Sequence, residues 1–383
     1  MNRSATKRRI IRFIKDQGFV LGEDEASIIP QQIGDKDRIR SLHSATRQRK
    51  LLVEAKFLKS NLDSLSRFFA DGEDINVREF SPQIIQVEAN SEMARLFRLG
   101  TLLWSVPVSR GFGRRLRFLV MDESNGKLIG LFAIGDPVFN LGIRDRLVGW
   151  DHHQRAKALY HVMDIFVLGA VPPYADLLCG KLIAMVTASN EVRNAVYNKY
   201  DEKKTNIRKE KKQPHIVLLT TISALGRSSL YNRVKFKDLQ LYNHIGETKG
   251  WGHFHLGDGT FEIMRKFLEQ IGHPIVRRNR FGQGPNWKMR TIRICLEELG
   301  LSSDLLKHGI LREVYTVPLA SNYIEYLIGE APSPDYYDLP ASELIAFFKK
   351  RWFIPRAERV KRYRDMTHLK TLESLREIVQ NTE

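Results

Sequence analysis

Two apolar runs separated by Ser-Asn-Gly constrain the fold of this chain more than any other feature. The first run is RRLRFLVMDE, residues 114–123, and the second is KLIGLFAIGD, residues 127–136. Asn-Gly readily adopts the positive φ values that a tight turn requires. The two runs are therefore predicted to form an antiparallel β-hairpin.

Strands and helices alternate around this hairpin, between residues 84 and 250. A strand is predicted at MDIFVLGAV (163–171), a helix at 181–197, and a further strand at 216–222 that leads into a short helix. Residues 1–80 are expected to form a basic helical region, residues 81–256 an α/β core, and residues 257–383 a second basic helical region. The predicted fold class is α+β, with a mixed sheet flanked by helices.

The charge balance favours polyanionic partners. The 61 Lys and Arg residues exceed the 44 Asp and Glu residues, which gives a net charge of +17. Nucleic acid, DNA in particular, is the expected partner, and a merely solvated basic surface is the alternative. Two distant cysteines support neither a zinc ribbon nor a disulfide framework. The N-terminus lacks an apolar signal core, so a cytoplasmic protein with no membrane partner is expected.

The stretches LLCGKLIAMV (177–186) and VLLTTISALGRSSLYNRVKF (217–236) resemble two parts of the GNAT acyltransferase fold. The first lies where that family has its pyrophosphate loop, and the second where it has a strand, a polar turn and a helix. The resemblance implies a cleft between two strands, with acyl-coenzyme A as the cofactor. The loop has one glycine, and Lys235 stands where the family has glycine, so both positions depart from the pattern.

The expected cleft brings several polar and basic residues together. Tyr231 falls at the position of the family's general acid, and packing of its ring in the core is the alternative role. His253 or Glu247 is the base of the acyltransferase hypothesis. Helix capping is the alternative role for the serines and Asn232. The residues expected to bind a ligand or phosphate are Gly180, Lys181, Ser223, Arg227, Ser228, Asn232 and Arg233.

The segment GETKGWGHFHLGDG, residues 246–259, carries two histidines at alternate positions. On a strand, His253 and His255 would point the same way and could bind a metal. Because no acidic or cysteine ligand stands nearby, aromatic packing is the favoured interpretation and no metal site is predicted.

Basic residues with neighbouring aromatics cluster in two later segments. Residues 277–301 are predicted to pass from a loop into an amphipathic helix, where Phe281 and Trp287 could stack on bases. A solvated basic face is the alternative. His308 is assigned a structural role near a helix end, and an acid-base role with an acidic partner is the alternative. The residues expected to bind nucleic acid are Arg277, Arg278, Arg280, Lys288, Arg290, Arg293, Arg312, Lys349, Lys350 and Arg351.

Several motifs in order resemble the Druantia anti-phage defence protein A family. They include GKLIAMVTASNEV, GETKGWGHFH, RFGQGPNWKMRTIR and RWFIPRA. The resemblance implies a component of a bacterial phage-defence system that works with a large helicase-like partner, and it brings no catalytic residues. Two hypotheses follow: a defence component that binds nucleic acid on an acyltransferase-like core, and an enzyme that acylates a protein or nucleic-acid acceptor.

Overall fold

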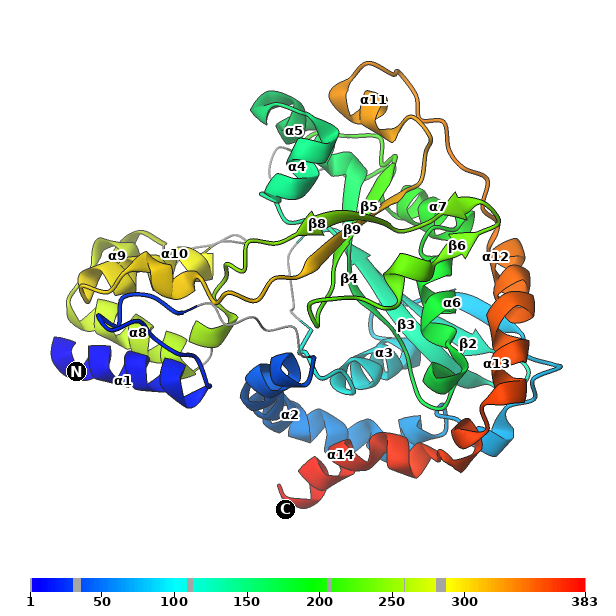
Figure 1. Ribbon diagram of the computed structural model, residues 1–383, viewed down its shortest axis with the longest axis horizontal. Coiled ribbons are helices and arrows are strands. Elements are labelled where there is room, and N and C mark those ends of the chain that lie inside the picture. The colour runs from blue at the N-terminus through cyan, green and yellow to red at the C-terminus, as the bar shows by residue number, and fades with distance from the viewer. Residues whose placement is uncertain are drawn as a thin grey trace.

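The predicted hairpin lies inside a seven-stranded mixed sheet in the computed structural model, which describes residues 2–29, 36–108, 113–204, 209–257, 259–279 and 287–382. The strand order is β1-β2-β3-β4-β5-β9-β8 (Figure 1). The strands are β1 (Pro82–Gln86), β2 (Arg115–Asp122), β3 (Lys127–Gly135), β4 (Val162–Ala170), β5 (Leu218–Ile222), β8 (Asn243–Glu247) and β9 (Glu313–Pro318). A separate small hairpin joins β6 (Lys235–Phe236) to β7 (Leu239–Gln240).

The β2–β3 turn forms as its sequence predicts. Gly126 has a φ of +69°, and its amide donates to the carbonyl of Asp122 over 2.8 Å. The buried Asp122 carboxylate accepts hydrogen bonds from the Ser124 amide and from the Tyr174 hydroxyl, the latter over 2.9 Å. The turn is thus fixed by backbone conformation and by a satisfied buried carboxylate.

Helices cover both faces of the sheet because side chains alternate along its strands. Phe118 and Val120 pack in the core on one face, with the helices α6 (Cys179–Val186), α7 (Asn190–Tyr200) and α12 (Ala341–Phe348). Leu119 and Met121 pack on the other face, with α2 (Lys36–Ser66), α3 (Glu92–Leu102) and α14 (His368–Gln380). The result is a three-layer core.

A third group of helices caps one end of the sheet (Figure 1). It comprises α4 (Gly142–Val148), α5 (His152–Ala158) and α11 (Tyr323–Ile328). Val148 and Leu327 pack there against Val162 of β4 and Leu218 of β5. Beyond α12, a π-helical turn (Lys349–Phe353) continues into α13 (Ile354–Arg359).

The neighbouring strands β4 and β5 form the parallel pair of the sheet. They pair from Val162 to Asp164 against Leu218 to Thr220 and then diverge. The Thr221 hydroxyl still donates to the Ile165 carbonyl over 3.0 Å, so a side chain bridges the opening.

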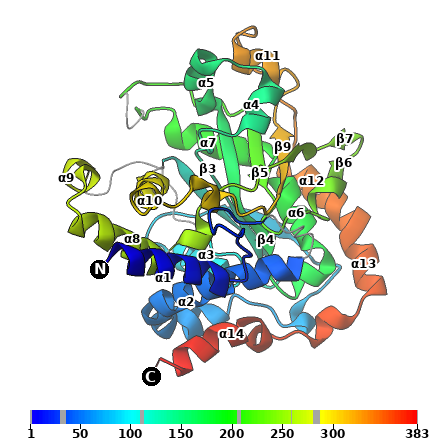
Figure 2. The ribbon, with the colours of Figure 1, turned by 60° about the vertical axis from the view of Figure 1, so that its left-hand side comes forward.

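A helical lobe projects from one side of the sheet (Figure 1). It is built from residues between β8 and β9, namely α8 (Gly259–Gln270), α9 (Pro274–Asn279) and α10 (Trp287–Glu298), together with α1 (Arg3–Asp16). Ile10, Ile11 and Ile14 of α1 pack in one core with Met264 of α8 and Cys295 of α10. Figure 2 brings this lobe forward and shows α1 alongside α8.

The α+β prediction is confirmed, with helical regions at both ends of the chain. Two local predictions are wrong. The short helix after β5 is a three-residue 3-10 turn, Tyr231–Arg233, and residues 254–256 form another 3-10 turn instead of a strand. Hydrophobic cores cross both borders of the expected three regions, because α1 packs on α8 and α2 packs on α14.

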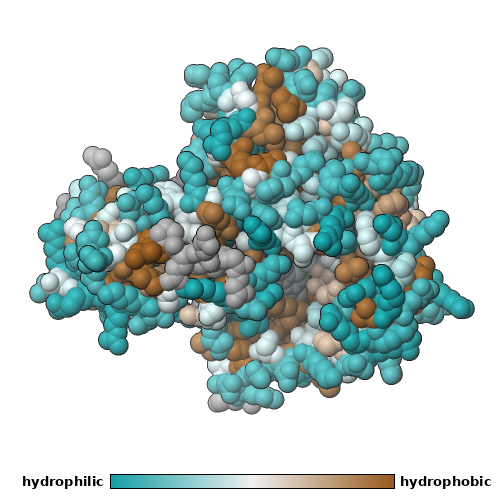
Figure 3. All heavy atoms as spheres, in the orientation of Figure 1, coloured by the Kyte–Doolittle hydropathy of each residue, from teal (hydrophilic) through white to brown (hydrophobic). Residues whose placement is uncertain are grey.

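No helix among the described residues is long and apolar enough to cross a membrane. Figure 3 shows a mostly hydrophilic face on which hydrophobic side chains gather in a few separate patches.

Candidate functional site

A cluster of cations lies at the start of α6. We call Lys181, Arg233 and Arg351 the cation cluster. Lys181 stands in the first turn of α6, and its Nζ lies 4.7 Å from the centre of the Trp352 ring. Burial lowers the pKa of Lys181, and the charges of Arg233 and Arg351 lower it further. Both arginines are therefore close enough to act on the charge of Lys181.

The cation cluster lacks a carboxylate counter-ion within the described ranges of the chain. None of its three side chains forms an ion pair with a carboxylate in the part of the chain that the structure describes. Arg233 and Arg351 are exposed, and Lys181 is partly buried. Gly180 precedes Lys181, and a Cβ at Gly180 would meet Leu230 only at 3.8 Å, so this glycine is not required by crowding. Oxyanions such as phosphate are the ligands that such a cluster favours.

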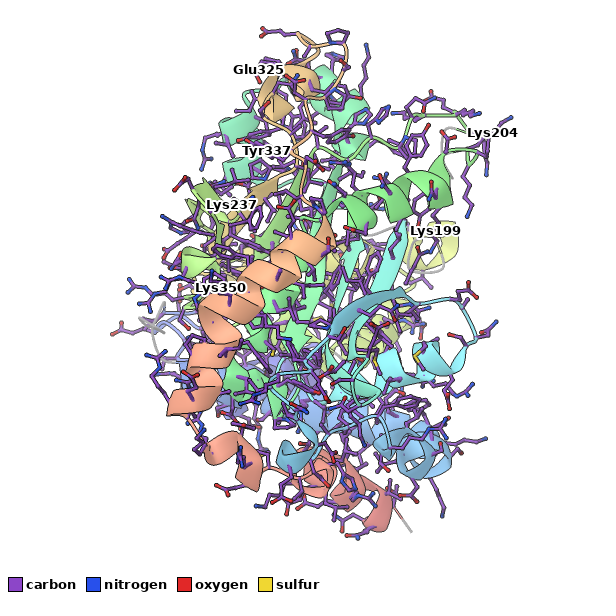
Figure 4. All side chains as sticks on the ribbon, turned by 90° about the vertical axis from the view of Figure 1, so that its right-hand side faces the viewer. Lys199, Lys204, Lys237, Glu325, Tyr337 and Lys350 are labelled. Carbon is purple, nitrogen blue, oxygen red and sulfur yellow. The ribbon has the colours of Figure 1, made fainter. Side chains whose placement is uncertain are left out.

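Figure 4 views this side of the molecule. Lys350 lies on the π-helical turn that continues α12, and Lys237 lies beside α12, where its Nζ is 3.2 Å from Glu343 Oε2. Lys349 points inward instead, because its ammonium donates to the carbonyls of Arg78 and Phe80, each over 2.8 Å. Among the expected basic residues of this segment, Lys350 and Arg351 are the exposed ones.

The polar turn after β5 is held by Glu313 at the start of β9. The Ser223 amide donates to the Glu313 carbonyl, and the Ser228 amide donates to Glu313 Oε2 over 2.7 Å. Ser228 Oγ in turn accepts from the amides of Leu230 and Tyr231, over 3.2 and 3.1 Å. The capping role is thus observed for Ser228, while Ser223 is buried and extends the β5–β9 pairing.

Glu313 also belongs to a hydrogen-bonded group at this strand end. The Tyr315 hydroxyl lies 2.5 Å from Glu313 Oε2 and 2.8 Å from Asn232 Oδ1. Asn232 Nδ2 donates to the Ser228 carbonyl over 3.0 Å. Arg227 is exposed and lies close enough to contribute its charge to Glu313. The group fixes the turn that carries Arg227 and Arg233.

The sequence prediction missed the role of Glu313 and Tyr315. Glu313 begins β9, and Tyr315 lies two residues further along the same strand. The short run of β-branched and aromatic residues in EVYTVP, with residues 314–317 all buried, is the signal that indicates a strand.

Tyr231 packs among other tyrosines. Its ring stacks on Tyr242 with centroids 4.8 Å apart and meets the Tyr315 ring edge-on at 5.1 Å. Burial raises the pKa of Tyr231 to about 12, against the lowering effect of a hydrogen bond with Thr221. This surrounding matches the packing alternative, and a hydroxyl with so high a pKa is poorly matched to general acid catalysis near neutral pH.

The two expected bases lie on different parts of the molecule. Glu247 ends β8 and is exposed, directly across from Glu313 in the β8–β9 register. His253 lies in the helical lobe, where burial and then the charge of Lys288 lower its pKa to about 4. Tyr231, by contrast, packs against the sheet core.

Arg312 lies at the junction of the lobe and the core. Its Nη2 is 3.4 Å from His43 Nε2, and its guanidinium lies 5.8 Å from the centre of the Phe254 ring. Burial lowers the pKa of Arg312. His43 and His308 have pKa values lowered to about 4 and about 3, first by burial and then by neighbouring charges. Arg312 was expected to contact nucleic acid at the surface. Its guanidinium is instead largely buried beside His43.

The remaining basic residues divide between exposed and undescribed positions. Arg290 and Arg293 are exposed on α10, and Lys288 lies 5.0 Å from the centre of the Phe261 ring. Trp287 also packs against Phe261, at 5.3 Å between ring centres. The expected contacts at Arg280 and Phe281, and the side chains of Arg277 and Arg278, lie outside the described residues. No group of metal-binding side chains occurs within the described ranges.

Comparisons with known proteins extend over the whole sheet. The family model described as DruA, Druantia protein DruA, matches residues 34–329. Druantia protein DruA of Escherichia coli (strain UMEA 4076-1) is 43% identical over 359 residues, which cover 94% of this chain and 88% of that protein. No solved structure matches this chain.

Proposed function

Because this chain belongs to the Druantia protein DruA family, it is a component of an anti-phage defence system, and we propose that it binds nucleic acid there. The cation cluster carries the proposal. Arg233 and Arg351 place positive charge beside Lys181, and none of the three has a carboxylate partner among the described residues, although the repulsion at Lys181 costs free energy. A bound anion would offset that repulsion.

Nucleic acid is the anion that suits the surroundings of the cluster. Backbone phosphates are repeated single charges, which arginine and lysine bind through charge-assisted hydrogen bonds. The partly buried Trp352 beside Lys181 offers an aromatic face on which a base can stack. The net charge of +17 attracts a polyanion from a distance. The exposed Arg290, Arg293 and Lys350 supply further contacts.

The nucleic acid is expected to be DNA. In this proposal a helicase-like partner unwinds it and supplies a single strand to this protein. This part of the proposal rests on the resemblance of the chain to its family. A protein that binds the phosphates of one strand is suited to hold the product of an unwinding reaction, because single strands bind through charge and stacking with little sequence preference.

The test is the salt dependence of binding to labelled single- and double-stranded DNA. Each phosphate contact on a single strand contributes about −0.7 to the slope of log K against log salt. The triple variant Lys181→Ala, Arg233→Ala, Arg351→Ala should therefore flatten the slope by about 2. A control removes the same charge at Lys56, Arg95 and Lys157, which are exposed elsewhere. Equal slopes for the wild type and the triple variant would refute the proposal.

A second candidate function, acyl transfer, is favoured by one observation. The sheet contains a parallel pair, β4–β5, which diverges after Asp164 and Thr220, and the loop into α6 follows β4. That arrangement supports the resemblance to acyltransferases. The residues present fit coenzyme A poorly, because the loop has one uncrowded glycine and Tyr231 is packed among tyrosines. Calorimetric titration with acetyl-coenzyme A tests this candidate function. The absence of a heat of binding would refute it.

A further inference from the structure

A basic groove runs between α1 and the beginning of α8. It encloses about 1080 Å³. One wall is the charged side of α1, and the other is the first turn of α8 with Gly259, Thr260 and Ile263. The charged residues that line it are Arg8, Arg9, Arg12, Lys15, Asp16 and Glu25. Figure 2 shows α1 and α8 side by side at the front of the lobe.

The cations of the groove are only partly neutralised. Lys15 Nζ lies 2.6 Å from Glu25 Oε1, whereas the Arg12 Nε–Asp16 Oδ2 pair is 3.8 Å long between exposed side chains. Arg8 and Arg9 are exposed and have no carboxylate partner within the described ranges. A surface pair such as Arg12–Asp16 contributes little. Two full positive charges therefore remain available on one wall.

A fifth cation reaches the same place from α2. The Arg49 guanidinium lies 5.3 Å from the centre of the Phe13 ring, and Phe13 lines the groove. A Cβ built on Gly259 would lie 3.6 Å from Arg49 Nη1, so this guanidinium stands at the first residue of α8. Two separate helices, α1 and α2, thus direct positively charged side chains to the groove.

The N-terminus of α8 adds hydrogen-bond donors. The first amides of a helix have no partner inside the helix, and the helix dipole is positive at this end. Glu262 lies in the first turn but is drawn to Arg265, 3.3 Å away along the helix. Phosphates commonly bind where such amides meet basic side chains.

An unsatisfied hydroxyl points to a ligand independently of the helix terminus. Thr260 lines the groove and is 1% exposed, yet its Oγ1 has no hydrogen-bond partner among the described residues. A buried donor that is left without an acceptor destabilises the folded protein. A phosphate oxygen at the start of α8 would accept this hydrogen bond.

We propose that the groove between α1 and α8 binds the backbone phosphates of a nucleic-acid strand through Arg8, Arg9, Arg49 and the Thr260 hydroxyl. The inference rests on the proposed function, since it names a second binding place for the same class of ligand. Figure 1 places α1 and α8 on one side of the sheet and α6 and α13 on the other. The groove and the cation cluster are therefore separate sites, and a strand that occupies both must cross the molecule.

The experiment measures binding of a short labelled DNA single strand over a range of salt concentrations. Arg8→Ala/Arg9→Ala should flatten the salt slope by about 1.4, and Thr260→Val should weaken binding severalfold while leaving the slope nearly unchanged. The control Lys56→Ala/Arg95→Ala removes the same charge outside the groove and should not change the slope. Unlabelled ATP as competitor separates a free nucleotide from a strand, because a mononucleotide site would release the DNA.

The outcomes distinguish this inference from the proposed function. If the cation-cluster variant loses affinity and Arg8→Ala/Arg9→Ala does not, the groove is not a binding site and the proposed function stands. If the groove variant loses affinity and the cluster variant does not, the groove is supported and the cluster is refuted. Thr260→Val should fold as stably as the wild type, since it replaces an unsatisfied hydroxyl with a methyl group of the same shape. Unchanged binding in this variant would overturn the role of the hydroxyl.

Discussion

Replacing Glu313 should release the turn between β5 and the cation cluster. Its carboxylate accepts hydrogen bonds from the Ser228 amide over 2.7 Å and from the Tyr315 hydroxyl over 2.5 Å. Ser228 and Tyr315 are buried, so neither donor finds water when the carboxylate is removed. Glu313→Ala removes both charged hydrogen bonds: it leaves the buried Ser228 amide without an acceptor and leaves the Tyr315 hydroxyl only Asn232 Oδ1, 2.8 Å away. Glu313→Gln keeps a neutral acceptor in place.

The size of the effect follows from these two hydrogen bonds. A hydrogen bond to a charged group contributes about 1.5–3 kcal/mol. The carboxylate is partly exposed, so we take the lower value for each bond and expect Glu313→Ala to lower the free energy of unfolding by about 3 kcal/mol. For Glu313→Gln we expect a loss of about 1–2 kcal/mol, because neutral hydrogen bonds contribute about half as much.

The pH dependence of stability gives a second test of the same hydrogen bonds. Burial alone would raise the pKa of Glu313, but the hydrogen bonds from Tyr315 and Ser228 outweigh it and lower the pKa below 4.5. A lowered carboxylate pKa stabilises the fold above pH 4.5, and this contribution is lost as the pH falls through the folded-state pKa. The stability difference between the wild type and Glu313→Gln should therefore shrink in acid.

Urea denaturation followed by tryptophan fluorescence and circular dichroism measures these differences, at neutral pH and near pH 4. Glu343→Ala is the matched control, since Glu343 forms an exposed pair with Lys237 and should change the stability little. The reasoning is refuted if Glu313→Ala is as stable as the control, or if the order of Glu313→Gln and Glu313→Ala is reversed.

Two further predictions concern the sheet and the lobe. Gly130→Ala should lower the free energy of unfolding, measured in urea titrations, by about 3 kcal/mol or more. The added Cβ would lie 2.5 Å from the Gly169 carbonyl oxygen of the neighbouring strand. A free energy of unfolding within about 0.5 kcal/mol of the wild type would contradict this close approach. The pKa values of His43, His255 and His308 are lowered by burial to about 4, 4 and 3, so their stabilising effect is complete above pH 6.5 and lost as the pH falls towards 4. The thermal midpoint of the wild type should therefore drop between pH 7 and pH 5. The drop should be smaller in His308→Asn, because the Asn amide oxygen can replace Nδ1 as the acceptor for the Ile310 amide without taking up a proton. An equal drop in both proteins would show that His308 is not responsible.

The sequence predicted the elements whose signals are local. The hairpin around Gly126, the helical region within residues 1–80 and the amphipathic helix within residues 277–301 all formed where their turn residues or periodicity indicated. Lys181 and Arg233 were predicted to share one cleft, whereas Arg351 was assigned to a different basic segment, because it lies far in sequence from Lys181 and no periodicity relates them. Their approach depends on α12 and α13 returning to pack over α6.

The errors have a common physical reason. Tyr231 and His253 are residues whose role depends on burial, and burial is decided by distant segments. Tyr231 meets Tyr242 and Tyr315, and His253 lies beside Lys288. The Glu313 anchor was missed because its partner Ser228 is 85 residues away in the chain. Local pattern identifies a strand end but not what holds it.

The packing of α1 against the lobe also means that α1 is synthesised long before the segments that cover it. The Gln17 side chain donates to the His255 carbonyl, 238 residues further along the chain. At about 5–20 residues per second, a ribosome needs roughly 10–50 s to make that intervening stretch. During this time Ile10, Ile11 and Ile14 have no α8 or α10 to cover them, so these three apolar side chains stay exposed until the lobe has been synthesised.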